Sequence, residues 1–410
     1  MVYIERELEK EISKYLPRKE ILAIVGPRQC GKTTMINKIL ESLKEKKKKI
    51  ENISFDNIKT LQLFNNDIDS FIKIHVENFD ILFIDEIHYS KNSGQKLKYI
   101  YDNFKTKLII SGSSAAEISI QSLKFLVGRI LTFNLYPFSF KEFLKAKEPR
   151  LIRLYEMGEY KKELTSIINS HLKEFILYGG YPNVVLSNKR EEKQKVLEGI
   201  YNTYFLKEIK EILELSENSK LINLLKALSL QIGNIANYNE LSKITGFSYS
   251  DIKKHLNILE KTYVCELIEP FHTNKRTELI KNPKIYFFDL GFRNICIDNF
   301  TEERSDKGVL YENFIFSEII KKNINLKFWN TKSKAEVDFI IERQNKIIPI
   351  EIKSLIKETK IPRSFNSFLE QYKPKKGYIL SLDFEDRKTI GKTKIEFLPF
   401  VKFTGKNNPQ

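Results

Sequence analysis

Short apolar runs alternate with amphipathic segments over the first third of the chain. The apolar runs have the length of buried strands and lie at 21–25, 53–55, 81–85, 107–112 and 129–137. Residues 35–49 between the first two runs have the pattern of a helix with a lysine-rich end, and residues 1–18 predict a short amphipathic helix that ends at Pro17. Such alternation predicts an α/β fold, with a parallel sheet covered by helices on both faces.

The pattern changes after residue 137. Residues 138–215 are mainly helical in pattern, with one break at the GGYP sequence of Gly179–Pro182, and a second helical unit spans about 216–262. After Pro270 the pattern again mixes strands and helices. We therefore expect four domains, at 1–137, 138–215, 216–270 and 271–410.

A glycine-rich loop follows the first predicted strand and opens a helix. Residues 26–33 read GPRQCGKT and match the P-loop pattern G-x-x-x-x-G-K-[ST] in the context that confirms it. The backbone N–H groups of such a loop face nucleotide phosphates, and the helix N-terminus adds a partial positive charge. Lys32 is expected to reach the β- and γ-phosphates of ATP, and the Thr33 hydroxyl is expected to bind Mg²⁺. The predicted nucleotide-binding residues are Gly26, Pro27, Arg28, Gln29, Cys30, Gly31, Lys32, Thr33, Thr34, Asp85 and Ser111.

Two carboxylates end the apolar run ILFID. Asp85 is expected to hold Mg²⁺ through water, and Glu86 is expected to polarise the attacking water. The next run ends in Ser111-Gly112-Ser113, where the hydroxyl of Ser111 or Ser113 could sense the γ-phosphate. An ordinary turn from strand to loop is an equal alternative for these serines.

The segments GPRQCGKTT, ILFIDEIH, LIISGSS, FLVGRILTFNLYPFSFKEF and LYGGYP resemble the AAA+ superfamily of P-loop ATPases. More narrowly, the chain resembles a prokaryotic, archaeal-type ATPase family with a helical lid, a winged helix and a C-terminal nuclease-like domain. The resemblance covers the first 182 residues, and later segments extend it. Family members carry Gly-Arg after the sensor strand, here Gly128-Arg129, so the resemblance implies that Arg129 helps to read the γ-phosphate, in cis or from a neighbouring subunit. A surface arginine that caps the following strand is the alternative.

Residues 238–262 have the layout of a helix-turn-helix. A short helix at 238–246 stops at a glycine, and an amphipathic helix at 251–262 follows, with Ser248 or Ser250 as its N-cap. A strand pair around 263–271 is expected to form the wing of a winged helix. On the second helix the candidate DNA contacts are Lys253, Lys254, His255 and Asn257. The alternative is a module that only packs between domains.

Acidic residues recur on two predicted strands near the C-terminus. The strands cover 335–342 and 347–353 and are joined by a short polar turn, which places Asp338 and Glu351 on neighbouring strands. Glu351 and Lys353 are two residues apart and share one face of their strand. Two carboxylates that bind Mg²⁺ and a lysine that stabilises developing charge are the groups that a metal-assisted phosphodiester cut needs.

This pattern resembles the PD-(D/E)XK nuclease superfamily, and the resemblance implies that Glu312 supplies a further acid from a helix. Val337 stands where many members carry proline. The alternative is that the acidic residues are solvated and make surface ion pairs. The predicted catalytic residues of the whole chain are Lys32, Glu86, Arg129, Glu312, Asp338, Glu351 and Lys353. The predicted metal ligands are Thr33, Asp85, Asp338 and Glu351.

Charge and composition indicate the kind of partner and the compartment of the protein. The chain has 69 basic and 53 acidic residues and a net charge of +16, which favours a polyanionic partner such as DNA, although a lysine-rich proteome is an equal explanation. Three cysteines without paired spacing fit a reducing cytoplasm, and the charged N-terminus is not that of a signal peptide. No apolar run approaches the roughly 18 residues of a membrane helix.

The sequence therefore predicts an ATPase of the AAA+ type whose Mg²⁺-dependent hydrolysis of ATP repositions a winged helix and a nuclease-like domain on DNA. A second hypothesis is a non-catalytic, ATP-gated switch or protein-interaction module in a defence or regulatory system. A third is a chaperone-like or transport-associated ATPase without a nucleic-acid partner. A homo-oligomer and a protein partner remain open.

Overall fold

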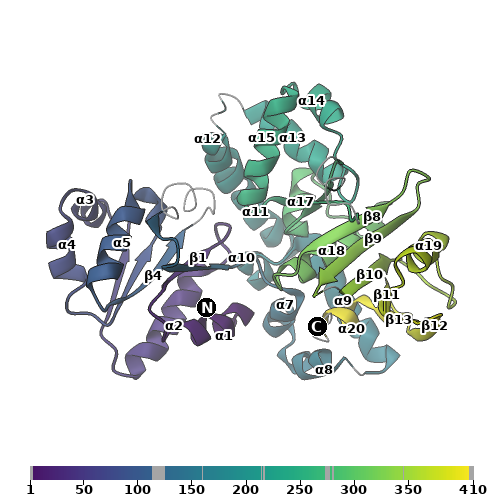
Figure 1. Ribbon diagram of the computed structural model, residues 1–410, viewed down its shortest axis with the longest axis horizontal. Coiled ribbons are helices and arrows are strands. Elements are labelled where there is room, and N and C mark those ends of the chain that lie inside the picture. The colour runs from purple at the N-terminus through teal and green to yellow at the C-terminus, as the bar shows by residue number, and fades with distance from the viewer. Residues whose placement is uncertain are drawn as a thin grey trace. The chain divides into compact units, whose positions relative to one another are not determined.

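The chain folds into two compact units, which Figure 1 shows in a computed structural model. One unit comprises residues 1–137 and 261–263, and the other comprises 138–260 and 264–410. The structure describes residues 3–112, 125–158, 160–213, 215, 218–272, 278, 281–344 and 346–405. Ser113, one of the two candidate sensor serines, lies outside the described residues.

The first unit is built on a five-stranded sheet with the order β2-β3-β4-β1-β5. Its strands are β1 (Ile21–Val25), β2 (Ile50–Ser54), β3 (Ile81–Asp85), β4 (Lys107–Gly112) and β5 (Ile130–Asn134). All neighbouring strands pair in parallel, as the alternating pattern predicted. The predicted limits were wrong for β2, which begins at Ile50, and for β5, which ends at Asn134 rather than Pro137.

Helices cover both faces of this sheet (Figure 1). They are α1 (Glu7–Tyr15), α2 (Lys32–Glu45), α3 (Ile58–Asn66), α4 (Ile68–His75), the 3₁₀ turn η1 (Ile87–Tyr89) and α5 (Ser93–Asn103). Ile12 of α1 and Met35 and Ile39 of α2 share one core with Leu22 and Phe83 of the sheet. The chain reverses its direction across the sheet after β2, so right-handed connections place α3, α4 and α5 on the opposite face.

Helix α2 begins and ends earlier than predicted. It begins at Lys32 because Gly31, with φ 92°, turns the chain directly into the helix. It ends at Glu45 rather than residue 49, and Lys47 follows with a positive φ of 62°. A run of neighbouring lysines at 46–49 repels itself on a helix, and the chain must instead reach strand β2 at Ile50.

The second unit opens with helices, as predicted for residues 138–215. They are α7 (Phe140–Lys147), the 3₁₀ turn η3 (Pro149–Leu151), α8 (Ile152–Met157), α9 (Lys162–Tyr178), α10 (Pro182–Leu186), α11 (Arg190–Ile200), the π-helix η4 (Tyr201–Ile209) and α12 (Lys210–Ile212). The break between α9 and α10 depends on Gly179, whose φ is 74° and where a Cβ atom would collide with the buried carboxylate of Asp289. That carboxylate accepts a hydrogen bond from the Gly180 N–H at 2.7 Å, so the break is fixed in place.

Three further helices precede a two-stranded antiparallel sheet. The elements are α13 (Asn218–Leu230), α14 (Tyr238–Thr245), α15 (Tyr249–Lys261), β6 (Cys265–Ile268) and β7 (Lys284–Phe287). The predicted pair of strands within 263–271 was wrong, because β6 pairs with β7 and not with a strand next to it. The Asp251 N–H donates to Ser248 Oγ at 3.2 Å, which makes Ser248 the N-terminal cap of α15.

The C-terminal part of this unit is a six-stranded mixed sheet with the order β12-β13-β11-β10-β9-β8. Its strands are β8 (Leu326–Asn330), β9 (Glu336–Arg343), β10 (Lys346–Ile352), β11 (Lys376–Ser381), β12 (Asp386–Ile390) and β13 (Thr393–Pro399). The helices around it are α17 (Leu290–Cys296), α18 (Lys307–Ile320), α19 (Arg363–Tyr372) and α20 (Phe400–Gly405). Strands β9 and β10 form the predicted antiparallel pair.

Candidate functional site

The P-loop connects β1 to α2 and lies against the end of β5. At Gly26 a Cβ atom would collide with the carbonyl of Leu135, so only glycine lets the loop approach this closely. Lys32 is buried, and its Nζ donates to the carbonyl oxygens of Gly26 at 3.0 Å and Pro27 at 2.9 Å. The ammonium is therefore held inside the curve of the loop, and its contact with the β- and γ-phosphates stays a prediction.

The predicted magnesium residues lie together at the ends of the strands. Thr33 Oγ1 donates to Asp85 Oδ2 at 2.7 Å, and Ser111 Oγ donates to Asp85 Oδ1. Both carboxylate oxygens of Asp85 are thus held by hydroxyl groups. Hydroxyl and carboxylate oxygens are the ligands that Mg²⁺ prefers, and an Asp85 already held on both oxygens suits contact through water.

Glu86 follows directly and is poised as an anion. Its backbone has a positive φ of 53°, which turns the side chain out of the strand direction, and His88 Nδ1 lies 3.1 Å from Glu86 Oε2. Burial opposes ionisation of Glu86, but His88, Lys32 and Arg28 outweigh it and hold its pKa below the usual value. A carboxylate that stays ionised is the form that can polarise a water molecule. His88 was missed by the sequence analysis, although its spacing of two residues from Glu86 in DEIH was visible.

Arg129 is engaged elsewhere in the first unit. Its Nε donates to Asp102 Oδ1 at 2.9 Å, its Nη2 lies 3.3 Å from Asp102 Oδ2, and its guanidinium lies 5.8 Å from the ring centre of Tyr101. This two-point pair with α5 corresponds to the alternative of a surface arginine before β5. The role of Arg129 at the γ-phosphate stays a prediction.

A second arginine, which the sequence analysis missed, holds the P-loop from behind. Arg6 is buried at the start of α1. Its Nη1 donates to the carbonyl of Cys30 at 2.8 Å, and its Nη2 donates to the carbonyl of Tyr136 at 2.7 Å. Arg6 thereby ties the P-loop to the segment that leaves β5. Nothing in the local sequence around Arg6 indicates a partner 130 residues away.

In the second unit, Asp338 and Glu351 lie on the neighbouring strands β9 and β10. Phe339 pairs with Ile350 in the antiparallel register. Asp338 therefore lies opposite Glu351, and residues opposite each other in an antiparallel pair point to the same side of the sheet. Asp338 Oδ2 accepts the N–H of Ile352 at 2.7 Å. Glu351 Oε1 lies 2.7 Å from Lys353 Nζ, whereas Glu351 Oε2 is buried and has no hydrogen-bond partner among the described residues.

The pKa values of Asp338 and Glu351 shift in the opposite direction to that of Glu86. Burial, together with the nearby Glu312 and Glu351, raises the pKa of Asp338 well above its usual value, although Lys284 opposes this shift. Burial also raises the pKa of Glu351, against the effect of Lys353. Clustered acids of this kind hold a proton or a cation.

Glu312 of α18 lies near these acids, but its carboxylate pairs with Lys284, a residue that the sequence did not indicate. Lys284 Nζ lies 3.4 Å from Glu312 Oε1 and 2.6 Å from Glu336 Oε1, and Tyr286 Oη also donates to Glu312 Oε1. Burial disfavours the ammonium of Lys284, but Glu312, Glu336 and Asp338 outweigh it and raise its pKa. Across the described part of the chain, no three His, Cys, Asp or Glu side chains form a group that could hold a metal ion. The assignment of Asp338 and Glu351 as metal ligands stays a prediction.

The candidate DNA contacts on α15 divide between its two faces. Lys253, Lys254 and Asn257 are exposed, and Lys253 Nζ lies 4.8 Å from the ring centre of Tyr249. The prediction for His255 was wrong, because His255 is buried and packs on the ring of Phe247 at 4.4 Å between ring centres. Its position follows the helical repeat that also buries Ile252, and not the exposed face.

Comparison with known proteins assigns three family matches along the chain. Residues 18–144 match a family described as an AAA domain, which agrees with the P-loop and the parallel sheet. Residues 169–303 and 307–403 match families described as domains of unknown function, DUF8612 and DUF4143. Among the described residues, no helix is both long enough and apolar enough to cross a membrane.

Two solved structures resemble the fold. The Walker-type ATPase PABY2304 of Pyrococcus abyssi is 15% identical, with a TM-score of 0.46, over 72% of this chain and 96% of that one. The ORC2 protein of Aeropyrum pernix in its ADP form is 10% identical, with a TM-score of 0.32, over 76% of this chain and 94% of that one. TM-scores of this size support no conclusion about function.

Relatives of similar length are also found by sequence. A Haemophilus influenzae protein described as uncharacterized is 25% identical over 353 residues, which cover 81% of this chain and 82% of the relative. The uncharacterized Methanocaldococcus jannaschii protein MJ1544 is 30% identical over 379 residues, which cover 89% of this chain and 80% of the relative. The chain therefore belongs to the family of MJ1544, and its N-terminal part is an ATPase-type P-loop domain of the AAA class.

Proposed function

We propose that the protein hydrolyses ATP with Mg²⁺ at the end of strands β1, β3 and β4. The observation that carries this proposal is the hydrogen-bonded group of Thr33, Asp85 and Ser111 beside a Glu86 whose pKa is lowered. Lys32 and the N–H groups of the P-loop neutralise the phosphate charge, and Thr33 and Asp85 hold the cation. Mg²⁺, when bound, withdraws charge from the phosphate oxygens, and Glu86 orients and polarises the water.

Multiple-turnover ATP hydrolysis by the purified chain tests this function. Glu86→Gln keeps nucleotide binding and lowers the turnover number by about 10²- to 10⁴-fold, because water loses its polarising carboxylate. Lys32→Ala lowers both binding and turnover. Glu77→Gln, which changes an exposed carboxylate of the same unit, is the matched control and keeps the wild-type rate. A wild-type protein that binds ATP but never turns over would instead be an ATP-gated switch.

The proposed action of the second unit is on DNA. Its proposed domains are a helical lid at 138–215, a winged helix at 216–270 and a nuclease-like domain at 271–410. The proposed compartment of the protein is the cytoplasm. Three features support the winged helix. They are the consecutive helices α14 and α15, the antiparallel pair β6–β7, and the antiparallel bridge between Ile235 and Lys284. The exposed Lys253, Lys254 and Asn257 of α15 are the proposed DNA contacts.

The proposed cation site of the nuclease-like domain consists of Asp338 and Glu351. The supporting observation is Glu351 Oε2, a buried oxygen without a partner among the described residues, beside an Asp338 whose pKa is raised. Lys353 pairs with Glu351 and would stabilise charge on a phosphodiester. Glu312 acts through Lys284 and Tyr286 rather than as a ligand.

Thermal unfolding with and without Mn²⁺ tests this site independently of cleavage. Mn²⁺ raises the melting temperature of the wild type by mass action, and Asp338→Ala abolishes that increase. Glu342→Gln, which changes an exposed acid of the same strand, keeps it. A metal-induced increase that survives Asp338→Ala contradicts the proposed site, and a DNA-cleavage assay in Mn²⁺ then decides whether the domain cuts or only binds.

A further inference from the structure

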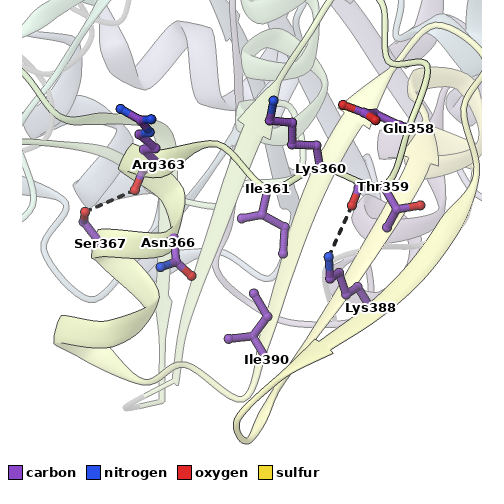
Figure 2. Close-up of a pocket in the computed structure, with 9 residues that line it drawn as sticks. All are labelled: Glu358, Thr359, Lys360, Ile361, Arg363, Asn366, Ser367, Lys388 and Ile390. Carbon is purple, nitrogen blue, oxygen red and sulfur yellow. Dashed lines mark hydrogen bonds between the residues drawn. The ribbon is translucent and has the colours of Figure 1, made fainter.

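A basic groove lies on the C-terminal sheet, and neither Asp338 nor Glu351 lines it (Figure 2). It has a volume of about 800 Å³ and is formed by the segment before α19, the first turns of α19 and the edge strand β12. The lining residues are Glu358, Thr359, Lys360, Ile361, Arg363, Asn366, Ser367, Lys388 and Ile390. No motif in the sequence pointed to these residues.

The groove carries a net positive charge on side chains that are exposed to a ligand. Lys360, Arg363 and Lys388 line it together with a single acid, Glu358. All three cations are exposed, and within the described ranges no acidic side chain pairs with Lys360 or Arg363. Exposed cations without partners retain their full charge for a ligand.

The walls of the groove are preformed. Lys388 Nζ donates to the Thr359 carbonyl at 3.3 Å, and Thr359 Oγ1 donates to Asp386, so β12 is tied to the segment before α19. Figure 2 shows Ile361 and Ile390 between the basic side chains, with Asn366 and Ser367 on the helix. Cations that alternate with amide, hydroxyl and aliphatic groups match the alternating phosphates and sugars of a nucleic-acid backbone.

We propose that this groove binds the sugar-phosphate backbone of DNA. The proposal rests in part on the proposed DNA-directed function, and it adds a binding surface other than α15. Strand β10 carries Glu351 and leads through Lys353 into the segment that forms the groove, so the same stretch of chain serves the carboxylate pair and the backbone contacts. DNA carries regularly spaced phosphates with condensed counterions, which basic side chains release when they bind. An acidic protein segment lacks this regular spacing of charge.

The salt dependence of DNA binding measures these contacts directly. The full-length groove variant Lys360→Ala/Arg363→Ala/Lys388→Ala is compared with a control variant, Lys195→Ala/Lys322→Ala/Lys375→Ala, which removes the same charge from exposed positions outside the groove. Each lost phosphate contact lowers the slope of log affinity against log salt by about 0.9 for duplex DNA. We therefore expect the groove variant to lose about 2–3 units of slope and the control variant to keep the wild-type slope.

Three outcomes overturn the proposal. The groove variant has the wild-type slope, or the control variant loses as much slope as the groove variant, or the groove variant loses binding to polyglutamate but not to DNA, which assigns the groove to an acidic protein. Equal melting temperatures and ATP hydrolysis rates show that the variants are folded, and Arg363→Gln alone replaces the triple variant if it unfolds. If the wild type itself shows no salt-dependent DNA binding, both the proposed DNA-directed function and the groove proposal are wrong, whereas the three outcomes above contradict the groove proposal alone.

Discussion

Glu86 and Asp338 are both acids that sequence motifs assign to catalysis, yet their surroundings shift their pKa values in opposite directions. Glu86 lies beside His88 and the cations of the P-loop, which outweigh its burial and lower its pKa. Asp338 lies among other acids inside the second unit, and burial raises its pKa. The first is suited to act as an ionised base, and the second is suited to exchange a proton for a cation.

Glu266 of β6 shows the same effect without a proposed catalytic role. Burial, with a smaller contribution from Glu260, raises its pKa to about 8 from an ordinary 4.5. Between these two pH values the unfolded chain has released the proton while the folded protein still holds it. The free energy of unfolding therefore falls as pH rises through this range and levels off above pH 8.

We predict that Glu266→Gln removes this loss of stability. A glutamine stays neutral in both states, so the variant loses less stability than the wild type between about pH 5 and pH 8. Urea unfolding of both proteins at several pH values measures the difference. Glu269→Gln, on the same segment, is the control. Parallel pH profiles for the wild type and Glu266→Gln would show that Glu266 is ionised in the folded protein.

At the level of secondary structure elements, helix α1 is part of the nucleotide site although it lies outside the P-loop motif. Arg6 at its start donates to the carbonyl oxygens of Cys30 and Tyr136. Hydrogen bonds from a charged donor contribute about 1.5–3 kcal/mol each, which is enough to set the shape of a loop. The helix thereby holds the loop in the curve that its phosphate-facing N–H groups require.

We predict that Arg6→Ala raises the KM for ATP by about tenfold or more, since each 1.4 kcal/mol of lost binding is a factor of ten. The turnover number changes less, because Lys32 and Glu86 remain in place and the loss affects binding of substrate and transition state alike. Arg6→Lys restores part of the affinity, because one ammonium can still reach a carbonyl. Steady-state kinetics with Lys10→Ala as the control measures this split. A fall in turnover number alone would contradict a role in shaping the P-loop.

Strand β7 and helix α18 meet the β9–β10 pair through Lys284. Its ammonium is buried between Glu312 and Glu336 and supplies a positive charge within the acidic cluster. Removing one partner of a buried ion pair leaves an uncompensated charge and destabilises a protein by about 3–5 kcal/mol. Lys284 therefore stabilises the arrangement of these elements.

We predict that Lys284→Met lowers the free energy of unfolding by about that amount and makes the protein more responsive to divalent cations. Mn²⁺ can then compensate the carboxylates that the lysine leaves, so the Mn²⁺-induced increase in melting temperature is larger in Lys284→Met than in the wild type. Lys322→Met changes an exposed lysine and leaves both quantities unchanged. A variant that is destabilised equally with and without Mn²⁺ would show that the cation does not compensate for the missing lysine.

At the scale of the whole molecule, the proposed ATP site and the proposed cation site belong to two different compact units. The residues of the ATP site all come from the first unit, and the carboxylate cluster and the basic groove come from the second. Each unit has its own sheet and its own hydrophobic core.

We predict that the two sites respond to mutation independently. Asp338→Ala leaves the rate of ATP hydrolysis within about twofold of the wild type, because the effects of substitutions at sites with no shared partners add. Glu86→Gln leaves the Mn²⁺-induced change in melting temperature intact. The rate of ATP hydrolysis and the Mn²⁺-induced change in melting temperature are both measured for each variant. A loss of ATP hydrolysis in Asp338→Ala, with an unchanged melting temperature, would demonstrate direct coupling between the sites instead.

The local sequence by itself determined the P-loop, the parallel sheet and the β9–β10 hairpin. These features depend on residues close together in the chain, whose order and spacing are visible in one dimension. Lys32, Thr33 and Asp85 were assigned because a strand, a glycine-rich loop and a helix place them by backbone geometry alone. The alternation of residues on a strand likewise placed Glu351 and Lys353 on one face, and the short polar turn placed Asp338 on the neighbouring strand.

Only the tertiary structure decided which partners these residues have. Arg6 meets Tyr136, and Lys284 meets Glu312 and Glu336, across separations that no local pattern records. The burial of His255, the pairing of β6 with β7 and the groove between α19 and β12 likewise arise from packing between elements. Side-chain charge and access depend on what lies nearby in space, and the sequence specifies those neighbours only through the complete fold.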